Sequence, residues 1–137
     1  MNNLLGIYYI KKPTIEGLKE YVKVISDDEN QIFLGIFTKD GEHIGNIKFD
    51  PVDVAKKYTI VGVLIGEKGW QGKGVFKEVN EKTGHFLKTN KNIDSIYLGV
   101  KTINTNAVSA YRKSGFVEIE TEKIVTADDE IGMVKYL

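Results

Sequence analysis

The sequence predicts an α+β fold in which one mixed, mostly antiparallel sheet is covered by helices. Short apolar segments typical of strands recur along the chain and are separated by turn signals. Between them, residues 75–88 and 104–116 carry the periodicity and end signals of helices. The 137 residues, 42% of them hydrophobic, are enough for one core. We therefore expect a single domain over residues 1–137.

The N-terminal part predicts a short strand and a helix. The apolar stretch LLGIYYI, residues 4–10, is too short to span a bilayer, and we interpret it as a strand. Thr14 can cap a helix whose apolar residues recur every three or four positions as far as Ile25. The acidic run SDDEN at 26–30 then ends the helix as a solvated loop.

Three strands are expected next. QIFLGIF at 31–37 and HIGNIKF at 43–49 predict a pair joined by a hairpin turn at Asp40-Gly41, with Pro51 closing the second strand. YTIVGVLIG at 58–66 is apolar on both faces, as expected of a central strand in a covered sheet.

The C-terminal half alternates strands with helices. Residues from Val75 to Leu87 carry one apolar stripe, which predicts an amphipathic helix. A shorter helix is predicted at 104–116, because basic residues fall in its last turn and Gly115 follows them. The remaining segments predict strands, the last two paired with each other: 95–100, 116–120 and 131–137.

Composition excludes several classes of function. The 19 basic residues balance the 19 acidic ones, so no global field favours nucleic acid or an anionic membrane. The chain has no cysteine, which excludes disulfides, a thiol nucleophile and zinc–thiolate sites. With only His43 and His85, a histidine-rich metal site is not expected either. We expect no metal, no nucleic-acid partner and no membrane partner, and the cytoplasm is the default compartment.

The glycine-rich segment after the predicted central strand is the first functional candidate. A Walker A loop fails because five residues, not four, separate Gly66 from Gly72, and Gly74 stands where a hydroxyl would bind magnesium. The dinucleotide fingerprint starting at Gly72 fails at Lys77. A strand, a glycine-rich turn and a helix N-terminus remain, and unpaired N–H groups there suit a pyrophosphate. A plain connecting turn fits this segment equally well.

Two motifs together resemble the GNAT acetyltransferase superfamily, in particular the branch that includes the ribosomal-protein alanine acetyltransferases. The signature (Gln or Arg)-x-x-Gly-x-(Gly or Ala) matches residues 71–75 and breaks at Phe76. HIGNIKFDP is also similar to a segment of that branch, and the resemblance covers roughly residues 14 to 122. The motif Asn-x-x-Ala-x-x-x-Tyr-x-x-x-Gly-Phe matches in full, at Asn104, Ala107, Tyr111, Gly115 and Phe116.

The resemblance implies acetyl transfer from acetyl-CoA to an amine without a metal, with a GNAT-like sheet. It places Tyr111 as the general acid for the leaving thiolate. Taken alone, Tyr111 also fits a core aromatic, and Asn104 a simple helix cap. The cofactor-binding residues implied are Leu64, Ile65 and Gly66 on the central strand, Gln71, Gly72, Lys73, Gly74, Val75 and Phe76 in the loop, and Asn104, Ala107 and Tyr111 in the second motif.

The general base is less sharply defined. Some family members carry a glutamate five residues before the motif asparagine, where this chain has Gly99. We take Glu67 as the candidate base, with Asp50 and Asp53 in the preceding loop as alternatives, acting through water.

Two departures from the family pattern affect the expectations. Phe76 replaces a small residue beside the pyrophosphate loop, and its place on the apolar stripe predicts that the ring turns into the core. The 13 residues before Thr14 are fewer than the family's usual strand and helices, which predicts a reduced N-terminal part. The acceptor is expected to be a small amine, an amino sugar or a protein N-terminus, and a homodimer is allowed. The alternative function is a non-catalytic acyl-CoA-binding module.

Overall fold

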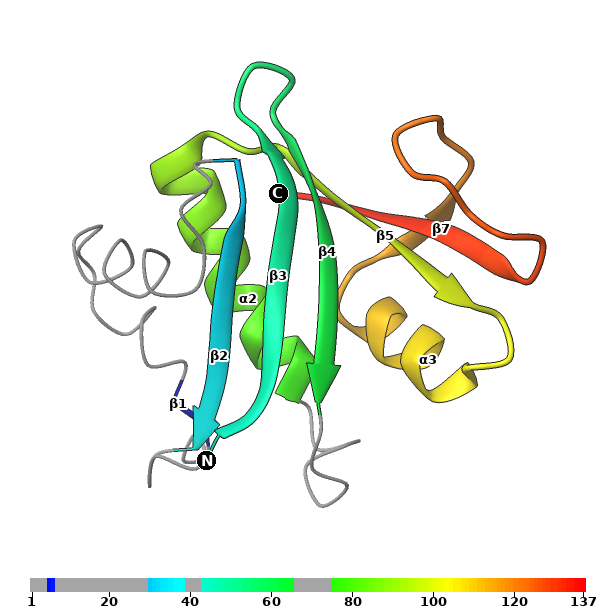
Figure 1. Cartoon of the computed structure of the whole chain (residues 1–137), viewed down its shortest axis with the longest axis horizontal. Helices are drawn as coiled ribbons and strands as arrows, with labels where there is room; N and C mark the ends of the chain where they lie inside the picture. The colour runs from blue at the N-terminus through cyan, green and yellow to red at the C-terminus, as the bar shows by residue number, and fades with distance from the viewer. Residues whose placement is uncertain (1–4, 7–29, 39–42, 66–74) are drawn as a thin grey trace.

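The computed structural model describes residues 5–6, 30–38, 43–65 and 75–137. They form a seven-stranded sheet in the order β1-β2-β3-β4-β5-β7-β6, together with helices α2 and α3 (Figure 1). The predicted mixed, mostly antiparallel α+β sheet is confirmed. The bounds are β1 Leu5–Gly6, β2 Ile32–Thr38, β3 His43–Asp53, β4 Tyr58–Ile65, α2 Val75–Lys91, β5 Ser95–Lys101, α3 Thr105–Lys113, β6 Val117–Ile119 and β7 Glu130–Tyr136.

The first four strands form an antiparallel half of the sheet, and the predicted pairing of 31–37 with 43–49 is confirmed. One boundary was wrong: Pro51 does not close β3, which continues to Asp53. The β3–β4 ladder is irregular between Phe49 and Val52, so the missing N–H of Pro51 falls at a bulge. The predicted turn at 40–41 and the predicted helix at 14–25 lie outside the described residues.

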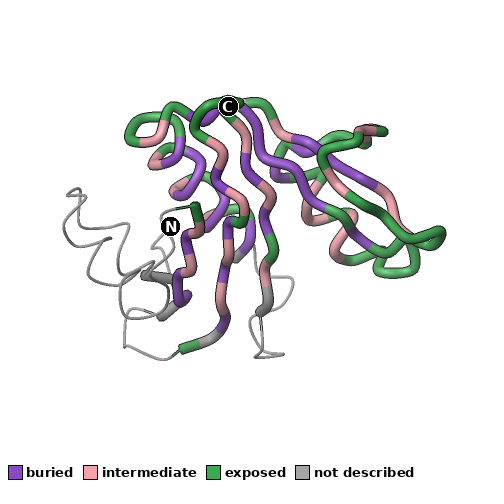
Figure 2. The backbone as a smooth tube through the Cα atoms, turned by 45° about the horizontal axis from the view of Figure 1, so that its top comes forward, coloured by how far each residue is buried: buried purple, intermediate pink, exposed green. Residues whose placement is uncertain are grey.

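Helix α2 covers one face of the sheet, which we call the helix face. Phe76, Val79, Thr83 and Leu87 are buried there, and the core under them includes Phe49. Figure 2 shows the buried positions alternating along the strands, as expected when only one face is packed against a helix. The predicted apolar stripe of this helix is therefore confirmed.

The opposite face, which we call the outer face, carries the alternate residues of the same strands. On β4 these are Tyr58, Ile60 and Gly62, because Thr59 and Val61 are buried on the other side. In Figure 1 this face is turned toward the viewer over β2, β3 and β4, with α2 behind them.

The parallel pair β4–β5 is short. Its register joins Tyr58 to Ser95 and ends where Ile60 meets Tyr97. Beyond these residues both strands continue, β4 to Ile65, but the structure pairs them no further and they diverge (Figure 1). We call this opening the seam. Among the described residues of β4 and β5, the backbone N–H and C=O groups beyond this point form no ladder bonds with one another, so an extended ligand could bind between the two strands.

Gly132 of β7 has no room for a side chain. A Cβ atom there would lie 2.7 Å from Ile124 Cδ1 and 2.8 Å from the backbone oxygen of Ile119. Gly132→Ala should therefore destabilise the fold by about 1–3 kcal/mol, because the backbone oxygen cannot move aside cheaply. Its matched control is the cross-strand partner Gly99, where a Cβ would meet only Thr126 at 3.7 Å. Urea unfolding should separate the two alanine variants; equal stabilities would contradict this packing.

Candidate active site

Helix α3 is held at the seam by its ends. The Asn104 side chain accepts a hydrogen bond from the Ala107 N–H at 3.2 Å, so Asn104 is the N-cap. Gly115 follows the helix with φ of +100°, a conformation that favours glycine. Asn80 of α2 donates to the Ser114 carbonyl at 3.4 Å and thereby ties the two helices together. Both predicted end signals of this helix are confirmed.

Tyr111 lies in an aromatic cluster between α2 and α3. Its ring packs edge-on against Phe76 with centroids 4.8 Å apart, and against Phe116 at 6.0 Å. The side chain is half-buried, and this burial raises the pKa of the Tyr111 hydroxyl above its ordinary value of 10.0. Among the residues the structure describes, that hydroxyl has no hydrogen-bond partner. Tyr111 is thus both a packing aromatic and a protonated hydroxyl still able to donate.

Phe76 occupies the first turn of α2 with its ring in the core. The residue is only 7% exposed, and its ring also lies 6.1 Å from that of Phe116. The expectation that the ring turns inward is therefore confirmed.

The end of β4 and the start of α2 lie at the same end of the sheet (Figure 1). Leu64 and Ile65 are the last residues of β4 and pair with Asn46 and Gly45 of β3, and Val75 opens α2. Helix α3, whose sequence includes Tyr111, lies at that end too (Figure 1). The other expected cofactor and base residues lie outside the described residues: Gly66, Glu67, Gln71, Gly72, Lys73 and Gly74.

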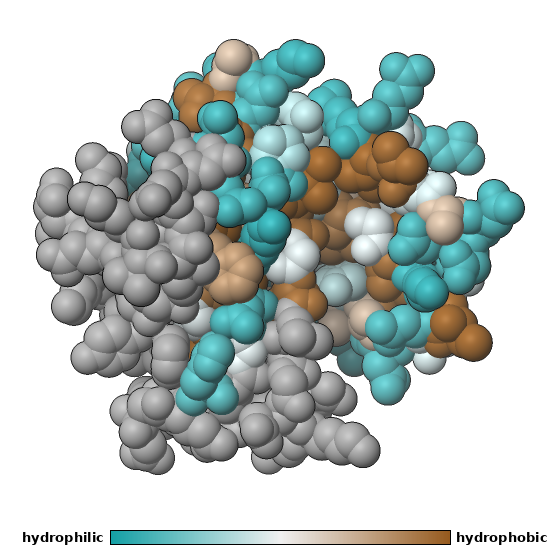
Figure 3. All heavy atoms as spheres, in the orientation of Figure 1, coloured by the Kyte–Doolittle hydropathy of each residue, from teal (hydrophilic) through white to brown (hydrophobic). Residues whose placement is uncertain are grey.

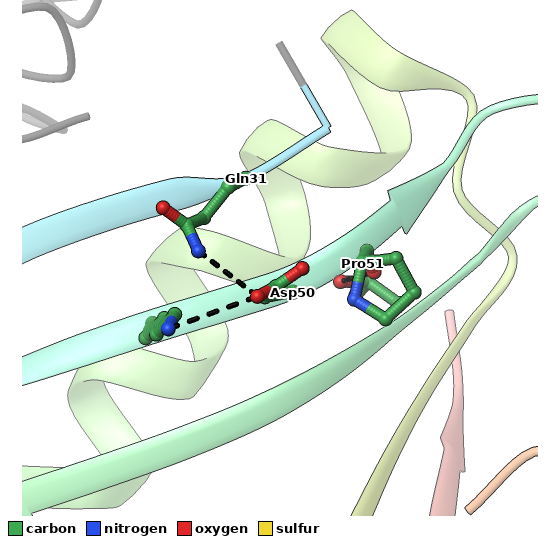
Figure 4. A network of polar contacts seen from close by, with 5 residues as sticks. Gln31, Asp50 and Pro51 are labelled. Carbon is green, nitrogen blue, oxygen red and sulfur yellow. Dashed lines mark hydrogen bonds and ion pairs between the residues drawn. The ribbon is translucent and has the colours of Figure 1, made fainter. Parts of the chain in front are cut away.

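The alternative bases Asp50 and Asp53 were expected in a loop, but both lie in β3. Asp50 accepts a hydrogen bond from Gln31 at 2.9 Å and pairs with Lys48 at 3.7 Å (Figure 4). Asp53 accepts the Lys56 N–H at 2.8 Å.

The position of Asp53 in the sheet also argues against a catalytic role. It pairs with Tyr58, the first residue of β4, whereas the glycine-rich segment follows Ile65 at the other end of that strand. Because both aspartates have structural partners and Asp53 lies at the far end of β4 from the glycine-rich segment, we no longer consider either of them a candidate base.

Two searches of the described residues bear on other functions. No group of three or more acidic, histidine or cysteine side chains gathers there as a metal site would require. None of the described helices is long and apolar enough to cross a bilayer.

A parallel strand pair that opens beyond Ile60 and a helix preceded in the sequence by a glycine-rich stretch are features expected of an acyl-CoA-dependent transferase. The sequence profile of the acetyltransferase (GNAT) domain matches residues 6–117. The chain belongs to this family. It is an acetyl-CoA-dependent N-acetyltransferase that transfers the acetyl group to an amine.

Individual relatives agree with this assignment. An N-alpha-acetyltransferase of Sulfolobus acidocaldarius is 27% identical over 118 residues, which cover 85% of this chain and 69% of that protein. The fold is similar to that of spermidine N-acetyltransferase from Vibrio cholerae in complex with CoA and spermine: the TM-score is 0.69 at 23% identity, covering 94% of this chain and 80% of the other. The fold is also similar to that of an N-acetyltransferase of Campylobacter jejuni in complex with acetyl coenzyme A. The TM-score is 0.65 at 16% identity, and the match covers 88% of this chain and 77% of the other.

Proposed function

We propose that the seam between β4 and β5 receives the thioester arm of acetyl-CoA and that Tyr111 protonates the leaving thiolate. The amine nitrogen attacks the thioester carbonyl carbon, the new C–N bond forms and the C–S bond breaks. The thiolate takes the proton of the Tyr111 hydroxyl, and the nitrogen loses its own proton to water. The observation that carries this proposal is the half-buried, protonated hydroxyl of Tyr111 on α3, the helix that lies at the same end of the sheet as the end of β4 (Figure 1).

The backbone supplies the other contacts in this proposal. A backbone N–H of β4 near Leu64, beyond the last pair with β5, would donate to the thioester oxygen as negative charge develops on it. The segment 71–76 would bind the pyrophosphate through its amides, beside the N-terminus of α2. Asn104 fixes the start of α3, and the small Ala107 keeps space beside Tyr111.

For the general base we keep Glu67, acting through water. The residue stands at the entrance of the segment after β4, next to the expected site of the thioester. Gly99 offers no side chain for this task. Deprotonation of the amine is required because only its neutral form attacks.

The acceptor is a primary amine on a small molecule, an amino sugar or a peptide N-terminus. The names of the relatives support both ends of this range, since one is an N-alpha-acetyltransferase and another a spermidine N-acetyltransferase. We further propose that residues 1–137 act as one domain in the cytoplasm, and a homodimer is allowed. The absence of cysteine fits a reducing compartment.

Thiol release from acetyl-CoA across a panel of amines tests the proposal. Acetyl transfer to at least one amine class is expected. The alternative is a module that binds acyl-CoA without catalysis. Tight CoA binding by calorimetry without turnover of any amine would support that module instead.

Gly74→Val should weaken CoA binding more than it weakens folding. A β-branched side chain restricts the backbone of a turn and keeps a phosphate at a distance. Calorimetry with CoA measures the loss, and thermal melting provides the control for folding. A variant that binds CoA as tightly as the parent would show that the glycine-rich segment is only a connector.

A further inference from the structure

Helix α3 has no buried residue of its own. All nine positions from Thr105 to Lys113 are exposed or half-buried, and Ala107, Val108 and Tyr111 pack only at the edge of the core. In Figure 3, mostly hydrophilic side chains cover the region of this helix. A helix this short is not stable in water without support from the rest of the fold. The position of α3, and with it that of Tyr111, therefore depends on the contacts at its ends.

The C-terminal end of α3 is closed by two hydrogen bonds of a turn. The Phe116 N–H donates to the Tyr111 carbonyl at 3.0 Å, and the Gly115 N–H donates to the Arg112 carbonyl at 3.1 Å. This is the Schellman motif, in which a glycine with positive φ follows the helix and the next residue packs back on it. That next residue is Phe116, whose ring lies 6.0 Å from the ring of Tyr111. The turn at 114–116 thus fixes the backbone of Tyr111.

Helix α2 holds this turn through Asn80. This residue is only 2% exposed, and its side-chain N–H donates to the Ser114 carbonyl at 3.4 Å. Ser114 is itself buried, and its own N–H donates to the carbonyls of Ala110 and Tyr111. If the turn moved away from α2, a buried amide and a buried carbonyl would each lose this partner, which is unfavourable. The hydrogen bond therefore resists such a displacement.

Strand β7 holds the same turn through Lys135. A Cβ placed on Gly115 would lie 3.3 Å from Lys135 Cε and 3.6 Å from Lys135 Cδ, so the end of the lysine side chain lies against the glycine. Lys135 stands between Met133 and Leu137, which both pack in the core, so its stem points to the helix face. Burial lowers the pKa of Lys135, and the nearby Glu81 carboxylate of α2 acts in the opposite direction. The stem is thus packed between β7, α2 and the turn.

We propose that Asn80 and Lys135 are positioning residues for acetyl transfer: together they clamp the turn after α3 and so hold the Tyr111 hydroxyl where it protonates the leaving thiolate. We call these two residues the clamp. Both act through the turn and not on the reacting atoms. This inference rests on the function proposed above, in which Tyr111 is the acid. A displacement of a reacting group by about 1 Å can lower a rate roughly a hundredfold, so a loosened turn slows the reaction even where the fold is intact.

Two substitutions loosen the clamp, and each has a matched control. Asn80→Leu keeps the approximate volume of the side chain but removes the donor to Ser114. Its control is Thr83→Val, because the buried Thr83 hydroxyl donates within α2 and not to the turn. Lys135→Ala removes the stem from Gly115, whereas Lys135→Met keeps most of it. Lys135→Ala changes a half-buried side chain, so it tests the clamp even where Asn80→Leu is unstable.

Each variant is measured on the full chain, alone and combined with Tyr111→Phe, below its melting temperature and with the best amine of the panel above. Asn80→Leu and Lys135→Ala should each lower kcat about tenfold with the KM for acetyl-CoA close to that of the parent, and the two controls should change kcat less than about twofold. In Tyr111→Phe neither clamp substitution should lower kcat further, because the hydroxyl that they position is gone. An equal loss in both backgrounds would show that the two residues only support the fold, and would overturn the proposal. A clamp variant that keeps the parent kcat removes its residue from the clamp.

The pKa of Tyr111 gives a readout that requires no turnover. Tyrosine labelled at Cζ allows the seven tyrosines to be titrated by NMR, and the signal missing from Tyr111→Phe belongs to Tyr111. Burial raises this pKa in the parent, so loosening the clamp should lower it toward 10.0, while both controls keep the parent value. An unchanged pKa in both clamp variants would contradict a displacement of Tyr111 and overturn the proposal.

Failure of the proposed function gives a different result. If Tyr111→Phe turns over as fast as the parent, or if no amine in a broad panel is acetylated, the acid role of Tyr111 fails, and the clamp inference fails with it. If Tyr111→Phe is slow but both clamp variants have the parent rate, the proposed function stands and the clamp alone is wrong.

Discussion

Tyr111→Phe is expected to lower kcat by roughly a hundredfold or more while the KM for acetyl-CoA stays close to that of the parent. The change removes only the hydroxyl, which acts when the thiolate leaves and not when the cosubstrate binds. The ring remains, so its edge-on contact with Phe76 at 4.8 Å is kept. Melting temperature should hardly change, because no described residue is hydrogen-bonded to that hydroxyl.

The pH dependence of the rate in the unmodified protein also tests the role of Tyr111. Burial raises the pKa of Tyr111 above 10.0, so the hydroxyl keeps its proton throughout the neutral and mildly alkaline range. The rate should therefore rise with pH as the acceptor amine loses its proton, and should show no decrease from Tyr111 below about pH 10. Tyr136→Phe, at an exposed tyrosine of β7, is the matched control and should be silent. Full turnover in Tyr111→Phe would leave Tyr111 as a packing residue only.

Phe76→Ala should reduce the free energy of unfolding by about 3–5 kcal/mol. Its ring is 7% exposed and packs against both Tyr111 and Phe116, so truncation leaves a cavity between α2 and α3. Urea denaturation measures the loss, and Phe76→Leu, which keeps much of the apolar volume, should lose clearly less.

CoA affinity separates this structural role from a blocking role. Measured below the new melting temperature, the affinity of Phe76→Ala for CoA should stay close to the parent value, because the ring points into the core. Unchanged stability combined with tighter CoA binding would mean that the ring plugs the cofactor site.

Local sequence signals were enough to predict most elements of the fold. The apolar stripe beginning near Val75 predicted α2, and Gly115 correctly marked the end of α3. The prediction that Pro51 ends the strand was wrong. A proline normally ends a strand, but here it coincides with a bulge in the ladder. Bulges depend on the partner strand, which the local sequence does not reveal.

The sequence motifs identified candidate site residues but did not reveal which other residues they contact. The second motif pointed to Asn104 and Tyr111 as candidates, and the structure adds that Asn104 caps the helix and that Tyr111 packs on Phe76. The position of Asp53 beside the first residue of β4 depends on sheet register, so it was misjudged as a loop residue.

The contact of Lys123 with the rings of Tyr58 and Tyr97 was not predicted, since it brings together residues far apart in the sequence.

The shortness of the β4–β5 pair also shapes how this protein folds and resists unfolding. Strands β2 to β4 each pair with the next strand along the chain, and β7 pairs with both β5 and β6, but joining the two halves requires a parallel pair across the whole of α2. That late step is secured by only a few ladder bonds and by the core under α2, and until it is complete the edges of β4 and β5 are templates for pairing with other chains. A cosubstrate bound between these edges would act as a bridging strand and stabilise the native state by mass action. Acetyl-CoA would thus protect the protein from aggregation as well as serve as its acetyl donor.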